Sequence, residues 1–177
     1  VAILDFIAFR GLPFAFSWGL AVIRWGEPRT TQDADLTLLT GFGNEEHFVD
    51  PLLAQFRSRI ADARTFALKR VLLLESSDGT PLDISLGALP FEAHLVERAT
   101  PFEFAEGCRL VTCSAEDLIV LKAFASRPLD WRDIEGVLAR HRARLDLQII
   151  RDHLAPLVQL KGQPEIMDRL NTLLSDR

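Results

Sequence analysis

The chain has 177 residues, 48% of them hydrophobic and 25% charged, which is typical of a folded protein and excludes a disordered one. Its net charge of −5 argues against a protein that coats nucleic acid through bulk electrostatics. Two cysteines are too few for a disulfide framework, and no apolar stretch reaches the ~20 residues that a membrane span needs. We therefore expect a soluble protein in the reducing cytoplasm.

The first forty residues are expected to alternate between helices and short strands. Residues 1–10 resemble the end of a helix that Gly11 and Pro13 stop. The run contains Asp5 and lacks a basic lead-in, so it is a poor signal peptide. The elements expected next are a buried aromatic strand at 14–18, a helix at 19–25 and a strand at 34–40.

The middle of the chain predicts one helix and a β-hairpin. Asn44 can cap a helix that we expect to run to about Ile60, because the acids at positions 45 and 46 suit its first turn. Two apolar strands follow at 69–75 and 80–86. Their link, Ser76-Ser77-Asp78-Gly79, has hairpin chemistry, so the two strands are expected to be antiparallel neighbours.

The last third of the chain is predicted to be helical. An extended stretch at 109–113 leads to Ser114, a cap for a helix in which Asp117 lies three residues on. Apolar residues then recur at helical spacing to the end of the chain. The fold class is thus α/β (α+β): a mixed sheet flanked by helices over residues 1–113, then a helical C-terminal region, residues 114–177, packed on this core.

Three acidic residues form the main chemical signal. Asp33 and Asp35 lie two residues apart at the start of a strand, which puts both carboxylates on one face. Asp83 is an acid inside a later strand, with Leu82 and Ile84 turned to the opposite face. If the two strands are adjacent, the three carboxylates converge and need a positive counter-charge, for which Mg²⁺ or Mn²⁺ is the natural choice. Such a site supports two-metal catalysis on a phosphoryl group.

A larger motif surrounds these acids and resembles the opening of the nucleotidyltransferase superfamily. Its pieces in this chain are Ser17-Trp18-Gly19, Gly26-Glu27-Pro28-Arg29-Thr30-Thr31 and Gln32-Asp33-Ala34-Asp35-Leu36, then Pro81-Leu82-Asp83-Ile84. A later segment with Lys122, Arg127, Asp130 and Asp133 is also similar. The likeness covers residues 14–141 and is strongest to the abortive-infection (AbiEii-like) toxins of bacterial toxin–antitoxin systems and their uncharacterised relatives.

The resemblance implies a metal-dependent enzyme that transfers a nucleoside monophosphate from an NTP to a hydroxyl and releases pyrophosphate. It implies that Asp33, Asp35 and Asp83 bind the metal and carry the catalysis. The nucleotide-binding residues that it implies are Ser17, Gly19, Arg29, Thr31 and Lys122. The acceptor would be a tRNA or a protein, and an antitoxin would be the partner.

One position departs from the family pattern. The turn usually carries two small residues that let backbone N–H groups approach the triphosphate, whereas here the first is Trp18 and only Gly19 is small. An indole at this position either blocks the phosphates or packs into the core. Trp18 thus motivates an alternative hypothesis, a degenerate member that binds a partner or nucleotide without chemistry.

Other residues leave alternatives open. Lys122 is either a surface lysine on an apolar helix or a triphosphate ligand, and Asp130 and Asp133 suit the first turn of a helix whatever their function. Arg127, Arg132, Arg140, Arg142 and Arg144 form either an RNA-binding patch or a solvated helix face. A second enzyme hypothesis is an antibiotic-modifying nucleotidyltransferase that uses small hydroxylated acceptors. The histidines and cysteines lack zinc-site spacing, and no Walker loop is present.

Overall fold

The structure is a computed structural model that describes residues 2–175, and the chain divides into two compact units. The first contains residues 2–20 and Thr30–Cys113, and the second contains Ala21–Arg29 and residues 114–175. The helix α2 (Trp18–Trp25) therefore contributes residues to both units. Residues 21–25 of this helix belong to the same compact unit as the C-terminal helices, although they lie early in the sequence.

Within the described residues, the first unit is built on one seven-stranded mixed sheet with the strand order β3-β4-β5-β2-β1-β7-β6. The strands are β1 (Phe14–Phe16), β2 (Ala34–Leu39), β3 (Arg57–Ser58), β4 (Val71–Glu75), β5 (Pro81–Gly87), β6 (Thr100–Ala105) and β7 (Cys108–Thr112). The α/β fold class predicted from the sequence is confirmed.

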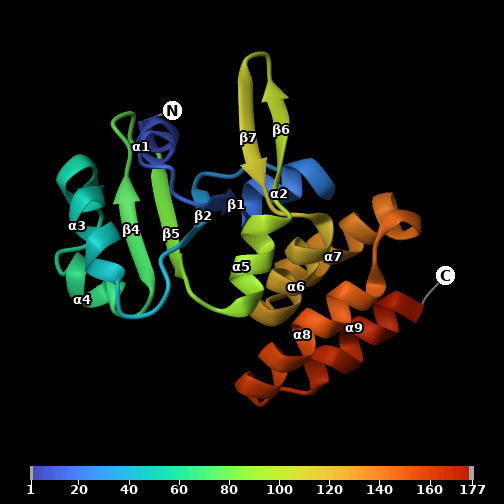
Figure 1. The fold of residues 1–177 in the computed structure, drawn as a ribbon. Helices are drawn as coiled ribbons and strands as arrows, with labels where there is room; N and C mark the ends of the chain where they lie inside the picture. The colour runs from blue at the N-terminus through green and yellow to red at the C-terminus, as the bar shows by residue number, and fades with distance from the viewer. Residues whose placement is uncertain (1, 176–177) are drawn as a thin grey trace. The chain divides into compact units, whose positions relative to one another are not determined.

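The centre of the sheet pairs β2 with β5 in parallel and with β1 in antiparallel orientation. The predicted hairpin is present, because β4 and β5 are antiparallel neighbours joined through Gly79, whose φ of +86° suits glycine. At one edge β6 pairs with β7, and this hairpin extends beyond the rest of the sheet in Figure 1. Sequence analysis predicted β7 but missed β6.

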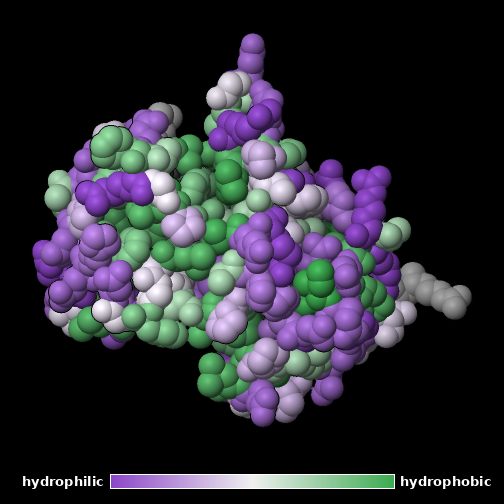
Figure 2. All heavy atoms as spheres, viewed as in Figure 1, coloured by the Kyte–Doolittle hydropathy of each residue, from purple (hydrophilic) through white to green (hydrophobic). Residues whose placement is uncertain are grey.

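Helices α1 (Ala2–Arg10), α3 (Glu45–Gln55) and α4 (Ala63–Ala67) pack on one face of the sheet. Their apolar residues join a buried cluster with alternate strand residues such as Leu36, Leu72 and Ile84. Because side chains alternate along a strand, the neighbouring residues of β2 and β5 point to the other face. Helix α5 (Pro90–Glu97), which the sequence did not predict, contacts β1 and β2. In Figure 2 the outer side of α3 and α4 is largely hydrophilic.

One helix prediction was wrong at its end. The helix after Asn44 stops at Gln55 and not near Ile60, because Phe56 has extended backbone (φ −121°, ψ 144°) and leads into β3. The side chain of Asn44 also makes no capping hydrogen bond. This difference affects the site, since it places Arg59 beside the sheet and not on a helix.

The second unit is helical, with α6 (Ala115–Ala125), α7 (Pro128–His141), a 3₁₀ turn (Arg142–Arg144), α8 (Leu147–Lys161) and α9 (Glu165–Ser175). Ser114 caps α6 as predicted, because its hydroxyl oxygen accepts the Asp117 N–H at 3.1 Å. Trp131 and Ile134 are buried at the predicted helical spacing.

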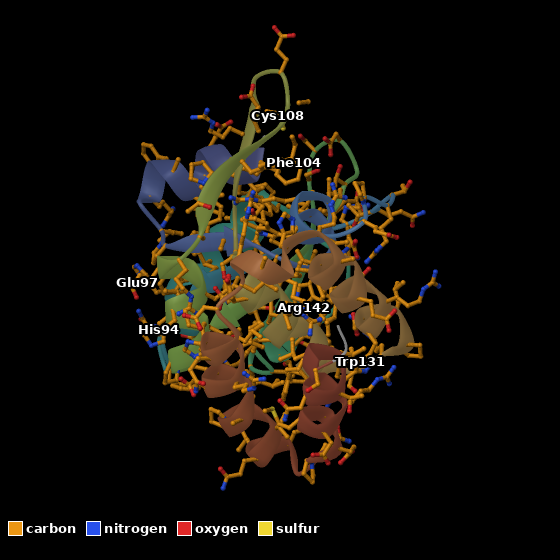
Figure 3. The ribbon with its side chains drawn as sticks, turned by 90° about the vertical axis from the view of Figure 1, so that its right-hand side faces the viewer. His94, Glu97, Phe104, Cys108, Trp131 and Arg142 are labelled. Atoms are coloured by element: carbon orange, nitrogen blue, oxygen red, sulfur yellow. The ribbon has the colours of Figure 1, made fainter. Side chains whose placement is uncertain are left out.

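The described residues contain no helix long and apolar enough to cross a membrane. Cys108 is exposed on the β6–β7 hairpin, near Phe104 in Figure 3, whereas Cys113 is buried. The two thiols are not joined in a disulfide.

Candidate active site

The three acidic residues singled out in the sequence lie together on the sheet. In the parallel pairing of β2 and β5, Asp35 is directly opposite Asp83, and Asp33 immediately precedes β2. One carboxylate oxygen from each residue lies within 4.8 Å of the other two. The carboxylates lie on the face of the sheet opposite to the buried side chains of Leu36 and Ile84.

Ser17 lies next to the carboxylate cluster, on the side of β2 that pairs with β1. Its backbone N–H donates to the carbonyl of Asp35 at 3.0 Å, so Ser17 lies beside Asp35 just after the end of β1. The residue is 1% exposed. The turn between β1 and α2 is therefore fixed directly next to the carboxylates.

Arg59 supplies a positive charge that the sequence did not predict. Its guanidinium is ion-paired with the carboxylate of Asp83. Burial raises the pKa of Asp83, the charge of Arg59 opposes that shift, and the negative charge of Asp33 raises the pKa further. The net result is a carboxyl pKa above its usual range. The alternation of Phe56, Ser58 and Ile60 with Arg57 and Arg59 was the available signal for an extended segment here.

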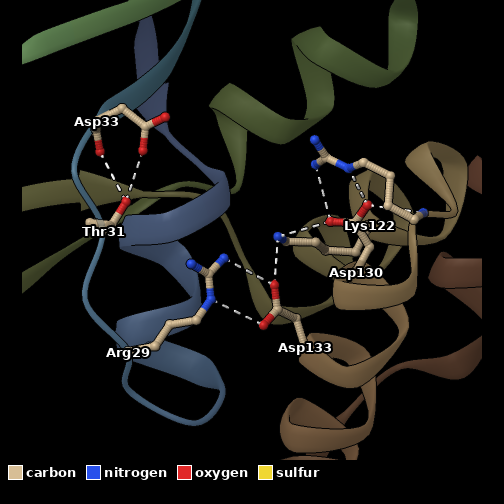
Figure 4. Close-up of polar contacts among 7 residues, drawn as sticks. Arg29, Thr31, Asp33, Lys122, Asp130 and Asp133 are labelled. Atoms are coloured by element: carbon tan, nitrogen blue, oxygen red, sulfur yellow. Dashed lines mark hydrogen bonds and ion pairs between the residues drawn. The ribbon is translucent and has the colours of Figure 1, made fainter.

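Glycine is required at position 19 because the side chain of Thr31 leaves no room for a larger residue. Thr31 lies against it, and a methyl group built at Gly19 would overlap the Thr31 hydroxyl and come within 3.0 Å of its Cβ. That hydroxyl donates to Asp33, with Oδ1 at 3.0 Å and the backbone carbonyl oxygen at 3.2 Å (Figure 4). Gly19 thus makes room for the side chain that orients one of the three acids.

We expect Gly19→Ala to lower stability by about 1–3 kcal/mol, because the added methyl group must displace Thr31. It should also weaken Mn²⁺ binding, because Asp33 loses the hydroxyl that holds its carboxylate in position. Thermal unfolding and Mn²⁺ titration measure the two effects. The double variant Gly19→Ala/Thr31→Ala should recover stability but not Mn²⁺ affinity. An unchanged melting temperature in the single variant would show that the contact is not tight.

Trp18, the departure from the family pattern, has unusual backbone geometry. Its φ is +47°, in the left-handed region that a bulky residue rarely adopts and that costs roughly 1–2 kcal/mol. The residue is half-buried. Position 18 is therefore one where glycine, which lacks a Cβ, would fit the backbone without strain.

The second unit contains a separate buried charge cluster on α6, α7 and the segment before β2 (Figure 4). The ammonium of Lys122 lies 3.2 Å from Asp130 Oδ1 and 2.7 Å from Asp133 Oδ2. Arg29 also donates to Asp133, at 3.4 and 3.3 Å. The side chain of Lys122 is 3% exposed, so it is not the surface lysine that one of the two hypotheses described.

Asp130 also caps α7. Its Oδ2 accepts the backbone N–H of Arg127 at 3.1 Å and the Arg127 Nε–H at 2.6 Å. Burial by itself raises the pKa of Asp130, but the hydrogen bonds and charges of Arg127 and Lys122 outweigh it and hold the pKa below its usual range. Asp130 is thus ionised and fully paired at neutral pH.

Several arginines of the suspected RNA-binding patch are used inside the second unit. Arg127 pairs with Asp130, and Arg140 donates to the carbonyl of Gly26 at 2.8 Å. Arg142 donates to the carbonyls of Leu173 and Leu174 near the end of α9. Arg140 and Arg142 therefore bind the backbone of other segments of the second unit, whereas Arg127 pairs within the first turn of α7.

The carboxylate cluster is chemically suited to a divalent metal ion. It offers only hard oxygen donors, which Mg²⁺ and Mn²⁺ prefer. The cluster brings three carboxyl groups together with the one guanidinium of Arg59, so the acidic groups are in excess and a divalent ion would offset them. The donor set therefore fits the metal that the sequence resemblance implies.

No protein-family model and no curated protein sequence match the chain. The chain does match solved structures. The solution structure of the antibiotic-resistance factor ANT(2″)-Ia matches with a TM-score of 0.54 and 22% identity over 94% of this chain and 93% of that one. A crystal structure of ANT(2″)-Ia with adenylyl-2″-tobramycin gives 0.53 and 22%, over 90% and 94%.

A third likeness is to the lincosamide antibiotic adenylyltransferase LnuA in its lincomycin-bound crystal structure. Its TM-score is 0.51 at 14% identity, over 77% of this chain and 92% of that one. At these identities the likeness concerns the fold, and the narrower resemblance to abortive-infection toxins stays a prediction. The chain therefore has the nucleotidyltransferase fold.

Proposed function

We propose that this protein is a metal-dependent nucleotidyltransferase. The observation that carries the proposal is the convergence of Asp33, Asp35 and Asp83 on a sheet of nucleotidyltransferase fold. An acceptor hydroxyl attacks the α-phosphorus of an NTP, and the bond from that phosphorus to the bridging oxygen breaks. The nucleoside monophosphate is joined to the acceptor, pyrophosphate leaves, and the hydroxyl proton is released.

The three acids divide this work. All three would hold divalent metal, which supplies charge stabilisation for the triphosphate and acidifies the attacking hydroxyl. Asp83 would complete the metal site and help to activate the acceptor hydroxyl. Thr31 keeps Asp33 in position through its hydroxyl.

The residues that we propose for the triphosphate lie before and after the Asp-x-Asp motif in the sequence. We assign Ser17, Gly19 and Thr31, which lie next to the carboxylates, to binding of the triphosphate. Arg29 and Lys122 are the cationic candidates, and both are oriented by Asp133. Direct contact between Lys122 and a phosphate would require its buried ion pairs to open.

For the acceptor we favour a small hydroxylated molecule over tRNA or protein. Two of the fold matches, covering 94% and 90% of the chain, are to ANT(2″)-Ia, an antibiotic-resistance factor also solved with adenylyl-2″-tobramycin. In addition, Arg127, Arg140 and Arg142 are engaged within the second unit, which weakens the case for an RNA-binding patch. A toxin paired with an antitoxin, acting on tRNA or protein, is the alternative.

The test is an NTP titration by calorimetry with Mg²⁺, followed by pyrophosphate release with three acceptor classes: aminoglycosides and lincosamides, bulk tRNA, and protein. We expect magnesium-dependent binding of an NTP and turnover with a small hydroxylated acceptor. Turnover only with tRNA or protein would support the toxin alternative. Absence of NTP binding would contradict the enzyme hypothesis.

Trp18→Gly distinguishes an enzyme from a degenerate binding protein. Glycine accepts the φ of +47° without strain, and it removes the indole from the turn. A wild-type protein that fails to bind NTP, beside a glycine variant that binds it, would show that Trp18 has closed the phosphate site. Equal binding by both would show that the indole lies clear of the phosphates.

A further inference from the structure

Arg59 lies at the carboxylate cluster but has no assigned role in nucleotidyl transfer. Its guanidinium is ion-paired with Asp83, one of the three acids whose oxygens converge. The side chains of Arg59 and Asp83 are 29% and 33% exposed, so the pair is partly shielded from solvent screening. The guanidinium of Arg59 is thus a fixed positive charge beside three carboxylates that also favour binding of a metal cation.

The backbone holds Arg59 in this place. Its N–H donates to the carbonyl of Leu73 at 3.0 Å, and Leu73 is paired with Asp83 across β4 and β5. Ser58, the residue before Arg59, pairs with Leu74 between β3 and β4. Its hydroxyl forms hydrogen bonds with the backbone of Ile60, the residue after Arg59. The arginine therefore reaches Asp83 over a single strand, from a segment pinned to the sheet.

An arginine and a metal ion compete in such a site. Three carboxylates held within 4.8 Å repel one another, and a guanidinium relieves part of that repulsion. A divalent ion relieves it more strongly but binds the same carboxylate of Asp83, of which Arg59 engages Oδ1. Each Asp83 oxygen that Arg59 engages is a weaker metal ligand, and the positive charge of the arginine also repels the incoming ion.

We propose that Arg59 is an internal counter-ion that competes with divalent metal for Asp83 and so sets the metal affinity of the cluster. This inference rests on the proposed function, because it takes the cluster to be the metal site. In the metal-free protein, Arg59 keeps the three acids together. Metal binding at Asp83 works against this ion pair, so the protein binds metal more weakly than its three carboxylates alone would.

The experiment measures Mn²⁺ binding to the wild type and to Arg59→Gln, with electron paramagnetic resonance of free Mn²⁺ at constant 0.15 M ionic strength. Arg57→Gln is the matched control: it removes the same charge two residues away, from an arginine that is 75% exposed and paired with Glu75. We expect Arg59→Gln to bind Mn²⁺ roughly five- to thirtyfold more tightly, because the lost pair is intermediate between an exposed and a buried one. Arg57→Gln should stay within about twofold of the wild type.

A second measurement does not depend on the resonance signal. Saturating Mg²⁺ should raise the melting temperature of Arg59→Gln more than that of the wild type, because stabilisation by a ligand grows with its affinity. Arg59→Lys, which keeps the charge, should remain close to the wild type in both assays.

The outcomes separate this inference from the proposed function. Wild-type Mn²⁺ binding with equal or weaker binding by Arg59→Gln would overturn the role of Arg59 and leave the metal site intact. Mn²⁺ binding by neither protein would overturn both. Binding by Arg59→Gln alone would support the inference in its strongest form, with Arg59 closing the site to metal.

Discussion

Asp35→Asn is expected to reduce nucleotidyl transfer by about a thousandfold or more. Asp35 is central in the carboxylate cluster, opposite Asp83 in the β2–β5 register and two residues after Asp33. An amide keeps the shape of the side chain but removes one of the charges that hold the metal. Since metal-ion catalysis contributes several kcal/mol, and each 1.36 kcal/mol is a tenfold change in rate, the loss should be of this size.

The same variant should not lose stability. Asp35 lies among like charges, so its neutralisation removes repulsion, and we expect an unchanged or slightly higher melting temperature without metal. Pyrophosphate release and thermal unfolding measure the two properties side by side. Asp50→Asn is the control, because Asp50 is exposed on α3, pairs with Arg64 and lies outside the cluster. Retention of full transfer activity by Asp35→Asn would rule out this cluster as the active site.

The convergence of the acids could be predicted because it depends on local rules. Alternation along a strand places Asp35 and Asp83 on the face opposite to Leu36 and Ile84, and the hairpin chemistry around Gly79 fixes β4 beside β5. The pairing of β2 with β5 does not follow from the sequence, because no local signal specifies which strands meet across the 41 residues between them, 40–80. The family resemblance made that pairing an expectation.

Arg59 shows where local reasoning failed. The acids after Asn44 are good helix-starting signals, but nothing as clear marks the end of that helix, and we extended it through Arg59. The chain in fact becomes extended at Phe56, because β3 completes the ladder beside β4. Tertiary pairing thus overrode a local preference, and the ion pair of Arg59 with Asp83 could not be predicted.

The ion pairs of Lys122 could not be predicted, for a related reason. On α6 it stands among apolar residues, which is typical of a lysine that reaches solvent along its stem. Its partners Asp130 and Asp133 lie on the next helix, after a turn in which Ser126 has a φ of +60°. Their convergence depends on how α7 packs against α6, and helical spacing within either element cannot show it.

The Lys122 cluster yields the largest expected effect on stability. Lys122→Met keeps the volume of the side chain but leaves Asp130 and Asp133 without their shared ammonium. Breaking a buried ion pair from one side costs about 3–5 kcal/mol, because it leaves an uncompensated charge in the interior. We expect a loss near the lower end, since Arg127 still pairs with Asp130 and Arg29 with Asp133.

Urea denaturation followed by tryptophan fluorescence measures this loss, because Trp131 is buried on the same helix as the two acids. Lys69→Met makes the same change at an exposed lysine and should alter stability by about 0.5 kcal/mol or less. Adding Asp133→Asn to Lys122→Met should recover part of the loss, because it removes one of the stranded charges. A loss in Lys122→Met no larger than in Lys69→Met would mean that the ammonium is not needed inside the second unit, and it would favour a direct role for Lys122 at the triphosphate.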